Sequence, residues 1–270
     1  MDEEELAHRA HTVARVHSDL LAEALGERRV RAVWLTGSTM LRDLTPTSDI
    51  DTVTLTAGEL GPGDAPALQH VHASLVERFP GLAYDTTYVD IASLARPPEP
   101  GLVVRQSLDG QLILDQPGGE IHPVTWFVLP DAIRVFGDHP GDVEIAVDRE
   151  AARAHSRENL RAYWLGSVVH GIRTALTDRA PEEALEQPDT VVWAVLGAPR
   201  LAMVLDPDAT HAGPIPSKTE AGHWVIEHHP DFADLATHAL AARRGGHVDL
   251  TVGDALLTAD LVERLASTVS

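Results

Sequence analysis

The sequence predicts two domains: an α/β domain, with a mixed sheet flanked by helices, followed by an all-α helical bundle. In the first half, segments whose apolar residues alternate as in strands are interspersed with segments whose apolar residues have helical spacing, an order typical of α/β folds. From about residue 149 onward the periodic segments have helical spacing, and prolines mark the connections between them. A chain of 270 residues is long enough for two cores of ordinary size. We therefore expect an α/β domain over 1–148 and a helical domain over 149–270.

The first 90 residues show the clearest alternation of elements. Apolar residues at helical spacing predict a helix from about Glu4 to Leu25, and Gly26 is a suitable residue to end it. The runs VRAVWLTG and DIDTVTLT predict two short strands. A helix over 67–79 and the alternating strand LAYDTTYVDI follow.

The rest of the chain changes character near residue 149. Residues 101–147 are rich in Pro and Gly between the short apolar runs LVVRQ, QLIL, TWFVL and IRVFG, which we interpret as further strands and loops. The second half contains five helical segments: REAARAHSRENLRAYWLGSVVHGIRTAL, TVVWAVLGAPRLAMVL, KTEAGHWVIEHHP, DFADLATHALAARR and VGDALLTADLVERLAS. Together they predict a helical bundle.

Composition excludes several classes of function. A formal net charge of −20 disfavours a nucleic-acid partner, because binding a polyanion depends on clustered Lys and Arg. Such a charge suits a cationic ligand, although acidity that serves solubility alone explains the same composition. The sequence has no cysteine and no apolar run of about 20 residues that could span a bilayer. Its acidic start, MDEEELAHRA, is unlike a signal peptide. We expect a cytoplasmic monomer without a membrane partner.

Two aspartates and a Gly-Ser pair carry the strongest functional signal. Asp49 and Asp51 fall on one face of an extended segment, because strand residues i and i+2 align. Two carboxylates repel each other, so the pair predicts a hard divalent cation; Mg²⁺ commonly uses one or two protein carboxylates plus substrate phosphates. Gly37 and Ser38 lie where a strand should turn into a helix, and there backbone N–H groups and the hydroxyl can donate to a phosphate. The combination predicts adjacent phosphate and metal sites.

The first of these motifs resembles a known family. Gly37-Ser38, followed by the SDID run that starts at Ser48, resembles the signature of the polymerase-beta-like nucleotidyltransferase superfamily. The resemblance implies that Asp49 and Asp51 bind metal, two Mg²⁺ ions in all. It also implies that the Gly-Ser turn, together with Ser48, holds the triphosphate of ATP.

The second half resembles the helical domain of the aminoglycoside adenylyltransferases that modify streptomycin and spectinomycin. The resemblance rests on APRLAMVL and PSKTEAGHWVIEHHP, and it implies that Arg200 and Lys218 act on the nucleotide. Lys218 is the only lysine among 21 basic residues, and a flexible ammonium suits a triphosphate that moves during reaction. Alternatively, Lys218 is a surface residue that remained lysine by chance, and Arg200 only covers a solvent-exposed face of its helix.

A third carboxylate is expected beside the aspartate pair, to accept the proton of the attacking hydroxyl and to bind metal. Asp85 in AYDTTYVD matches an acidic residue, typically Glu, of the family; Asp is one methylene shorter, which leaves open whether it acts directly or through a water. Asp90 is the rival, although its place at the strand end favours a solvated or capping role. By the same resemblance Asp189 meets an amine of the acceptor; a helix N-cap is the alternative.

The predicted reaction is transfer of AMP from Mg-ATP to a hydroxyl of a small cationic acceptor, an aminoglycoside or aminocyclitol, with release of pyrophosphate. The LAM run from Leu201 replaces an aromatic pair of the family, so a different acceptor pocket is expected. The same transfer to another small molecule or to a protein hydroxyl stays open, as does a nucleotide-binding module without turnover. The fifteen histidines form no zinc motif, and we expect them on helix faces and at solvated ends.

Overall fold

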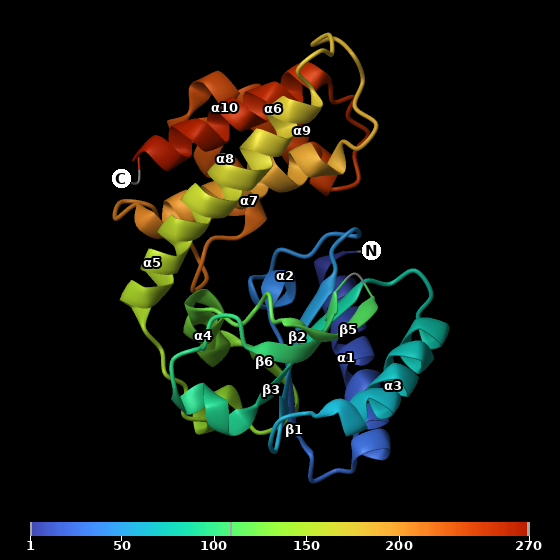
Figure 1. Cartoon of the computed structure of the whole chain (residues 1–270). Coiled ribbons are helices and arrows are strands. Elements are labelled where there is room, and N and C mark those ends of the chain that lie inside the picture. Colours follow the sequence, from blue (N-terminus) through green and yellow to red (C-terminus); the bar gives the residue numbers. More distant parts are fainter. Residues whose placement is uncertain (1, 109, 269–270) are drawn as a thin grey trace. The chain divides into compact units, whose positions relative to one another are not determined.

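The computed structural model describes residues 2–108 and 110–268, which form two compact units. Unit 1 comprises the chain up to Leu44 together with Ser48–Ala152, and unit 2 comprises Thr45–Thr47 and the chain from Arg153 onward. Figure 1 shows the sheet of unit 1 and the helices of unit 2. The assignment of 1–148 and 149–270 as functional domains stays a prediction.

Unit 1 is built on a mixed sheet of six strands in the order β5-β4-β3-β2-β1-β6. β2 and β3 are parallel, and the other neighbouring pairs are antiparallel. The strands are β1 Val30–Leu35, β2 Ile50–Thr56, β3 Tyr84–Asp90, β4 Val103–Leu108, β5 Gln111–Pro117 and β6 Ile133–Gly137. The strands predicted in VRAVWLTG, DIDTVTLT and LAYDTTYVDI are confirmed, and those in LVVRQ, QLIL and IRVFG are present as β4, β5 and β6.

The run TWFVL, interpreted above among strands and loops, is helical. It lies in α4 (Pro123–Val128) and the short 3₁₀ helix η3 (Leu129–Asp131) that continues it. Pro123 stands at the start of the helix, where it has no backbone N–H to satisfy, and the ring of His122 accepts a hydrogen bond from the backbone N–H of Thr125. These local start signals outweigh the β propensity of the apolar residues.

Helices α1 (Glu3–Leu25) and α3 (Ala65–Arg78) lie side by side on one face of the sheet (Figure 1). Their apolar residues form one core with the sheet, which includes Val13, Leu68 and Ile50. A separate core lies on the other face and includes Trp34, Leu55 and residues of α4 and η3. Each face of the central strands is therefore covered, as a predominantly buried sheet requires.

Local signals explain why α1 forms as predicted. The side chain of Asp2 accepts a hydrogen bond from the backbone N–H of Glu5, and Glu5 accepts one from the backbone N–H of Asp2, which together form a capping box. The helix ends at Gly26, whose φ of 90° is accessible to glycine at little cost. The remaining short helices of unit 1 are α2 (Gly37–Met40), η1 (Pro62–Asp64), η2 (Ile91–Ala95) and η4 (Pro140–Asp142).

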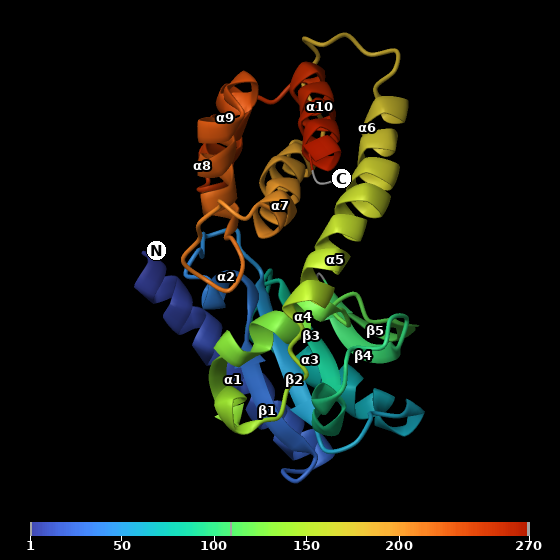
Figure 2. The ribbon, with the colours of Figure 1, turned by 90° about the vertical axis from the view of Figure 1, so that its left-hand side faces the viewer.

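Unit 2 is built from helices around a core of its own. One continuous helical segment runs from α5 (Arg149–Asn159) through the wider π-helical turns of η5 (Leu160–Val169) to α6 (His170–Ala175), as Figure 2 shows. The other helices are α7 (Asp189–Leu205), α8 (Lys218–His228), η6 (Pro230–Phe232), α9 (Ala233–Arg243) and α10 (Val252–Thr268). Across the described residues, none of the helices has both the length and the apolarity that crossing a bilayer demands.

Candidate active site

The turn after β1 packs closely against Asp51 of β2. The backbone N–H of Thr36 donates to the carbonyl oxygen of Asp51 over 2.9 Å, which ties the end of β1 to β2. Gly37 follows with a φ of 51°, in the left-handed region that favours glycine. A Cβ atom on Gly37 would lie 2.6 Å from Cγ of Asp51 and closer still to its Oδ2, so a larger residue cannot occupy this position without moving the carboxylate.

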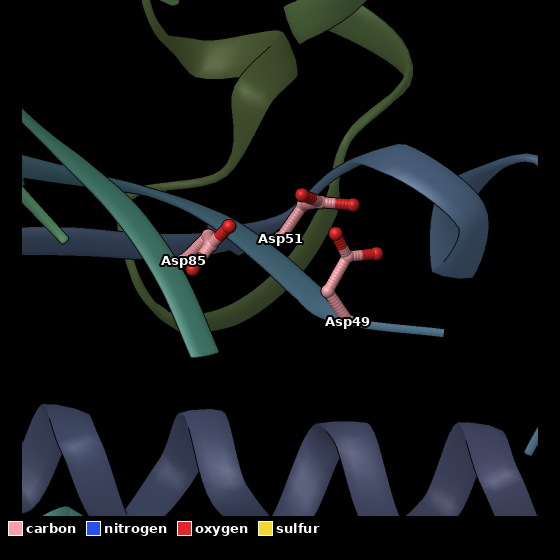
Figure 3. Close-up of side chains that lie close together, drawn as sticks. All are labelled: Asp49, Asp51 and Asp85. Carbon is pink, nitrogen blue, oxygen red and sulfur yellow. The ribbon is translucent and has the colours of Figure 1, made fainter. Parts of the chain in front are cut away.

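Three carboxylates gather beside this turn. Asp49, Asp51 and Asp85 each offer an oxygen atom, and these atoms all lie within 4.8 Å of one another. Asp51 and Asp85 are register partners in the parallel pair β2 and β3, so their side chains share a face as predicted. Asp49 lies two residues before Asp51 and reaches the same side, and Figure 3 shows the three carboxylates pointing toward a common space. We call these three residues the acidic cluster.

The acidic cluster has the chemistry of a site for a hard divalent cation. Each of its three side chains is half-buried, so the mutual repulsion of the negative charges is less screened than at an open surface. Carboxylate oxygens are the ligands that Mg²⁺ prefers, and a cation at this point would offset the repulsion. The residues therefore fit the metal that the sequence predicts.

Ser38 provides a polar group that the fold itself does not use. Its Oγ atom is buried and finds no hydrogen-bond partner among the described residues. Burying a hydroxyl without a partner costs free energy, on the order of 1–3 kcal/mol, so such an atom calls for an external partner. Ser38 adjoins Gly37, which itself touches the acidic cluster through Asp51. A phosphate oxygen bound beside a metal would accept this hydrogen bond.

Two residues of unit 1 remain: Ser48, predicted to bind the triphosphate, and Asp90, the alternative to Asp85 as the third carboxylate. Ser48 is half-buried in the loop that leads to Asp49. Asp90 begins η2 as its N-cap, where its carboxylate accepts hydrogen bonds from the backbone N–H groups of Ala92, at 3.2 Å, and Gly58, at 3.0 Å. Asp90 thus has the capping role expected for it, and the acidic cluster forms without it.

Three predicted residues belong to unit 2. Arg200 lies on α7, and its Nε donates to the carbonyl oxygen of Pro216 over 2.7 Å, which fixes the segment that leads into α8. Lys218 is the first residue of α8, directly after Ser217, whose side chain caps the helix. Asp189 is exposed at the first position of α7, and Pro188 occupies the N-cap, so the alternative of Asp189 as an N-cap is wrong.

Sequence reasoning missed a set of buried polar side chains on the face of the sheet opposite to the acidic cluster. His17 and His72 lie on the apolar faces of α1 and α3 and are 0% and 6% exposed, whereas solvated ends were one expectation for the histidines. Their partners are hydroxyl groups of Tyr84 and Tyr88 on β3. A signal was present in the sequence: each histidine has helical spacing from apolar neighbours, which places it in the core.

Comparison with known proteins adds a likeness of fold. The sequence matches no protein-family model and no curated protein. The structure is similar to a solved structure of spectinomycin adenyltransferase AAD(9) from Enterococcus faecialis with ATP and spectinomycin, with a TM-score of 0.65 over 92% of this chain and 96% of that chain. The two sequences are 13% identical over this match. At this identity the similarity shows a shared fold: a nucleotidyltransferase-like α/β unit combined with helices.

Proposed function

We propose that the protein transfers AMP from ATP to a hydroxyl group of an aminoglycoside or aminocyclitol, with release of pyrophosphate. The observation that carries the proposal is the gathering of Asp49, Asp51 and Asp85 on adjacent strands, within 4.8 Å of one another. The shared fold with an adenyltransferase whose structure holds ATP and spectinomycin supports it. The net charge of −20 favours a cationic acceptor.

The acidic cluster divides the chemistry between its members. Asp49 and Asp51 would hold the cation with Asp85 as a third ligand, and Mg²⁺ would supply positive charge at the attacking oxygen and at the leaving group. Asp85 accepts the proton of the acceptor hydroxyl, directly or through a water. The hydroxyl oxygen then bonds to the α-phosphorus of ATP, the bond from that phosphorus to the bridging oxygen breaks, and pyrophosphate leaves with the bridging oxygen.

Further residues have a proposed role in positioning the triphosphate. Gly37 keeps the space in front of the Asp51 carboxylate free of side-chain atoms. Ser38 donates its orphaned hydroxyl hydrogen to a phosphate oxygen, a charge-assisted hydrogen bond, and Ser48 assists from the loop before β2. For unit 2, the sequence resemblance leads us to propose Arg200 and Lys218 as residues that act on the nucleotide and Asp189 as a residue that meets an amine of the acceptor.

The test is a screen for pyrophosphate release. The protein is incubated with Mg²⁺ and each of ATP, GTP, CTP and UTP, against a panel of aminoglycosides and aminocyclitols, and product masses identify the transferred group. The proposal expects acceptor-dependent release with ATP and a product heavier by one adenylyl group. Adenylylation of another small molecule or of a protein would replace the proposed acceptor, and nucleotide binding without transfer to any acceptor would indicate a binding module.

A pair of variants ties the reaction to the acidic cluster. Asp51→Asn removes one metal-binding charge with little change of shape, and transfer should fall by about 10²-fold or more, as expected when electrostatic stabilisation of the transition state is lost. Asp115→Asn changes an exposed carboxylate on strand β5 of the same sheet and should leave transfer unchanged. A folded Asp51→Asn variant with wild-type turnover would refute the assignment.

A further inference from the structure

Buried polar side chains form a continuous hydrogen-bond network behind the acidic cluster. Its outer part joins helices α1 and α3 to strand β3. His72 Nε2 lies 2.8 Å from Tyr88 Oη, and Tyr88 Oη lies 3.0 Å from His17 Nε2. The other ring nitrogen of His17, Nδ1, lies 2.8 Å from Tyr84 Oη. The imidazole of His17 therefore bridges the two tyrosines.

The inner part of the network reaches the backbone of the acidic cluster. Thr52 Oγ1 lies 3.1 Å from Tyr84 Oη and 3.1 Å from the carbonyl oxygen of Asp85. Thr52 follows Asp51 on β2, and Tyr84 precedes Asp85 on β3, so both side chains point to the face away from the carboxylates. We call His72, Tyr88, His17, Tyr84 and Thr52 the buried network; it ends on the peptide group of Asp85.

The number of protons in the buried network is determined by burial. All five side chains are between 0% and 6% exposed. Burial lowers the pKa of His72 to about 4, and burial together with the nearby His72 lowers the pKa of His17. Burial also raises the pKa values of Tyr84 and Tyr88 above their ordinary value. At neutral pH each imidazole thus carries one N–H and each hydroxyl keeps its hydrogen.

The inner bonds share one donor. Thr52 donates its single hydrogen both to the carbonyl oxygen of Asp85 and to Tyr84 Oη, which makes a three-centre hydrogen bond. Tyr84 therefore has its own hydrogen for Nδ1 of His17, and His17 carries its hydrogen on Nε2.

The same count extends to the outer part. His17 donates from Nε2 to Tyr88 Oη, and Tyr88 donates to Nε2 of His72, which carries its hydrogen on Nδ1. The hydrogen bonds thus run from Thr52 outward to α3. A buried network of this kind is rigid, because any displaced member leaves a neighbour unpaired.

We propose that the buried network positions Asp85: it holds the peptide group of Asp85 against β2 and thereby sets the place of the third carboxylate relative to Asp51. The proposal names Thr52 and Tyr84 as positioning residues, which act through Asp85 and touch no substrate. It rests on the proposed function in assigning the acidic cluster to metal binding and proton transfer. Its physical basis is the bond from Thr52 to the carbonyl oxygen of Asp85.

The chain offers a matched pair of variants for the test. Thr52→Val keeps the shape of the side chain and removes the hydroxyl that bonds to Asp85. Thr54→Val makes the same change two residues later, on the same strand and the same face. Thr54 is also buried, at 0% exposed against 4% for Thr52, and its Oγ1 bonds to Oγ1 of Thr86 at 2.9 Å instead of to Asp85. Both variants lose one buried hydroxyl, so loss of stability should be similar.

The first readout is metal affinity, measured with Mn²⁺ alone by electron paramagnetic resonance. For Thr52→Val we expect the dissociation constant to rise about tenfold, the lower end of what outer partners of metal ligands contribute. For Thr54→Val we expect less than about a twofold change, and Thr52→Ser, which keeps the hydroxyl, should recover most of the affinity. Equal Mn²⁺ affinities for the two valine variants would overturn the proposal.

The second readout separates positioning from a general loss of stability. In the transfer assay, kcat of Thr52→Val should fall about tenfold while KM for ATP stays within about threefold, and Thr54→Val should match the wild type. If Mn²⁺ affinity responds as expected but no nucleotide is ever transferred, the proposed function fails and the positioning role stands. If the wild type transfers AMP and both valine variants behave alike, the positioning role fails and the proposed function stands.

Discussion

Gly37 and the carboxylate of Asp51 lie so close together that a side chain on residue 37 would overlap the carboxylate. A Cβ there would lie 2.6 Å from Asp51 Cγ. The relationship couples the Gly-Ser turn to the acidic cluster, because the turn can pass this close only if its first residue has no side chain. Two features predicted separately from the sequence are thus parts of one local structure.

Replacement of Gly37 by alanine should damage function more than stability. The added methyl group would displace the Asp51 carboxylate, and a positive φ for alanine costs about 1 kcal/mol. We expect Mn²⁺ affinity and transfer to fall at least tenfold, as when a metal ligand is moved. Gly81→Ala is the control: Gly81 has a φ of 75°, and a Cβ there meets nothing within 4 Å. The same loss of Mn²⁺ affinity in both variants would show that backbone strain is the cause.

Replacement of Asp85 by asparagine should stop the chemistry while nucleotide binding persists. The amide preserves shape but cannot accept the proton, and a positioned general base contributes about 10²- to 10⁴-fold in rate. We expect calorimetry to show that Mg-ATP still binds, because Asp49, Asp51 and the triphosphate also hold the ion, and we expect product formation to fall by that factor. Asp90→Asn should have little effect, because the asparagine oxygen can still accept the two backbone hydrogen bonds of the cap. An inactive Asp90→Asn together with an active Asp85→Asn would reverse the assignment.

The single lysine should not tolerate arginine. Lys218→Arg keeps the positive charge but replaces a compact ammonium by a planar guanidinium. If Lys218 contacts the triphosphate, loss of one hydrogen bond to a charged group predicts that ATP affinity or turnover falls roughly ten- to a hundredfold. Circular dichroism checks that α8, capped by Ser217, is intact. Unchanged kinetics in Lys218→Arg would indicate that Lys218 is a surface residue without a role in nucleotide binding.

Burial of His72 makes stability depend on pH. Its pKa is about 4 in the folded protein against an ordinary 6.5, so between these values the unfolded chain binds more protons and the free energy of unfolding falls as pH falls. From pH 7 to pH 5 the contribution of His72 is on the order of 2 kcal/mol. His72→Gln should reduce this dependence in urea unfolding. His70→Gln, an exposed change on the same helix, should not, and parallel pH profiles for the two variants would contradict the prediction.

Features carried by short stretches of sequence could be predicted without the structure. Helix α1 follows from its apolar spacing and from a glycine at its end, both local properties. Asp49 and Asp51 share a side because alternation along an extended backbone places residues i and i+2 together. The run TWFVL shows the limit of such reasoning. Its apolar residues are compatible with strand or helix, and the capping by His122 and Pro123 decided between them.

Features that depend on contacts between distant segments were decided by tertiary structure alone. The pairing of β2 with β3 in parallel register brings Asp85 to Asp51, and a shift of one residue would turn Asp85 to the opposite face. The buried network joins α1, α3 and two strands, so no local pattern reveals which hydroxyl each histidine meets. The sequence by itself determined which residue types are present and how each short segment alternates. The folded chain decided which of them meet, because strand register and burial in a common core are properties of the whole sheet and of the helices that cover it.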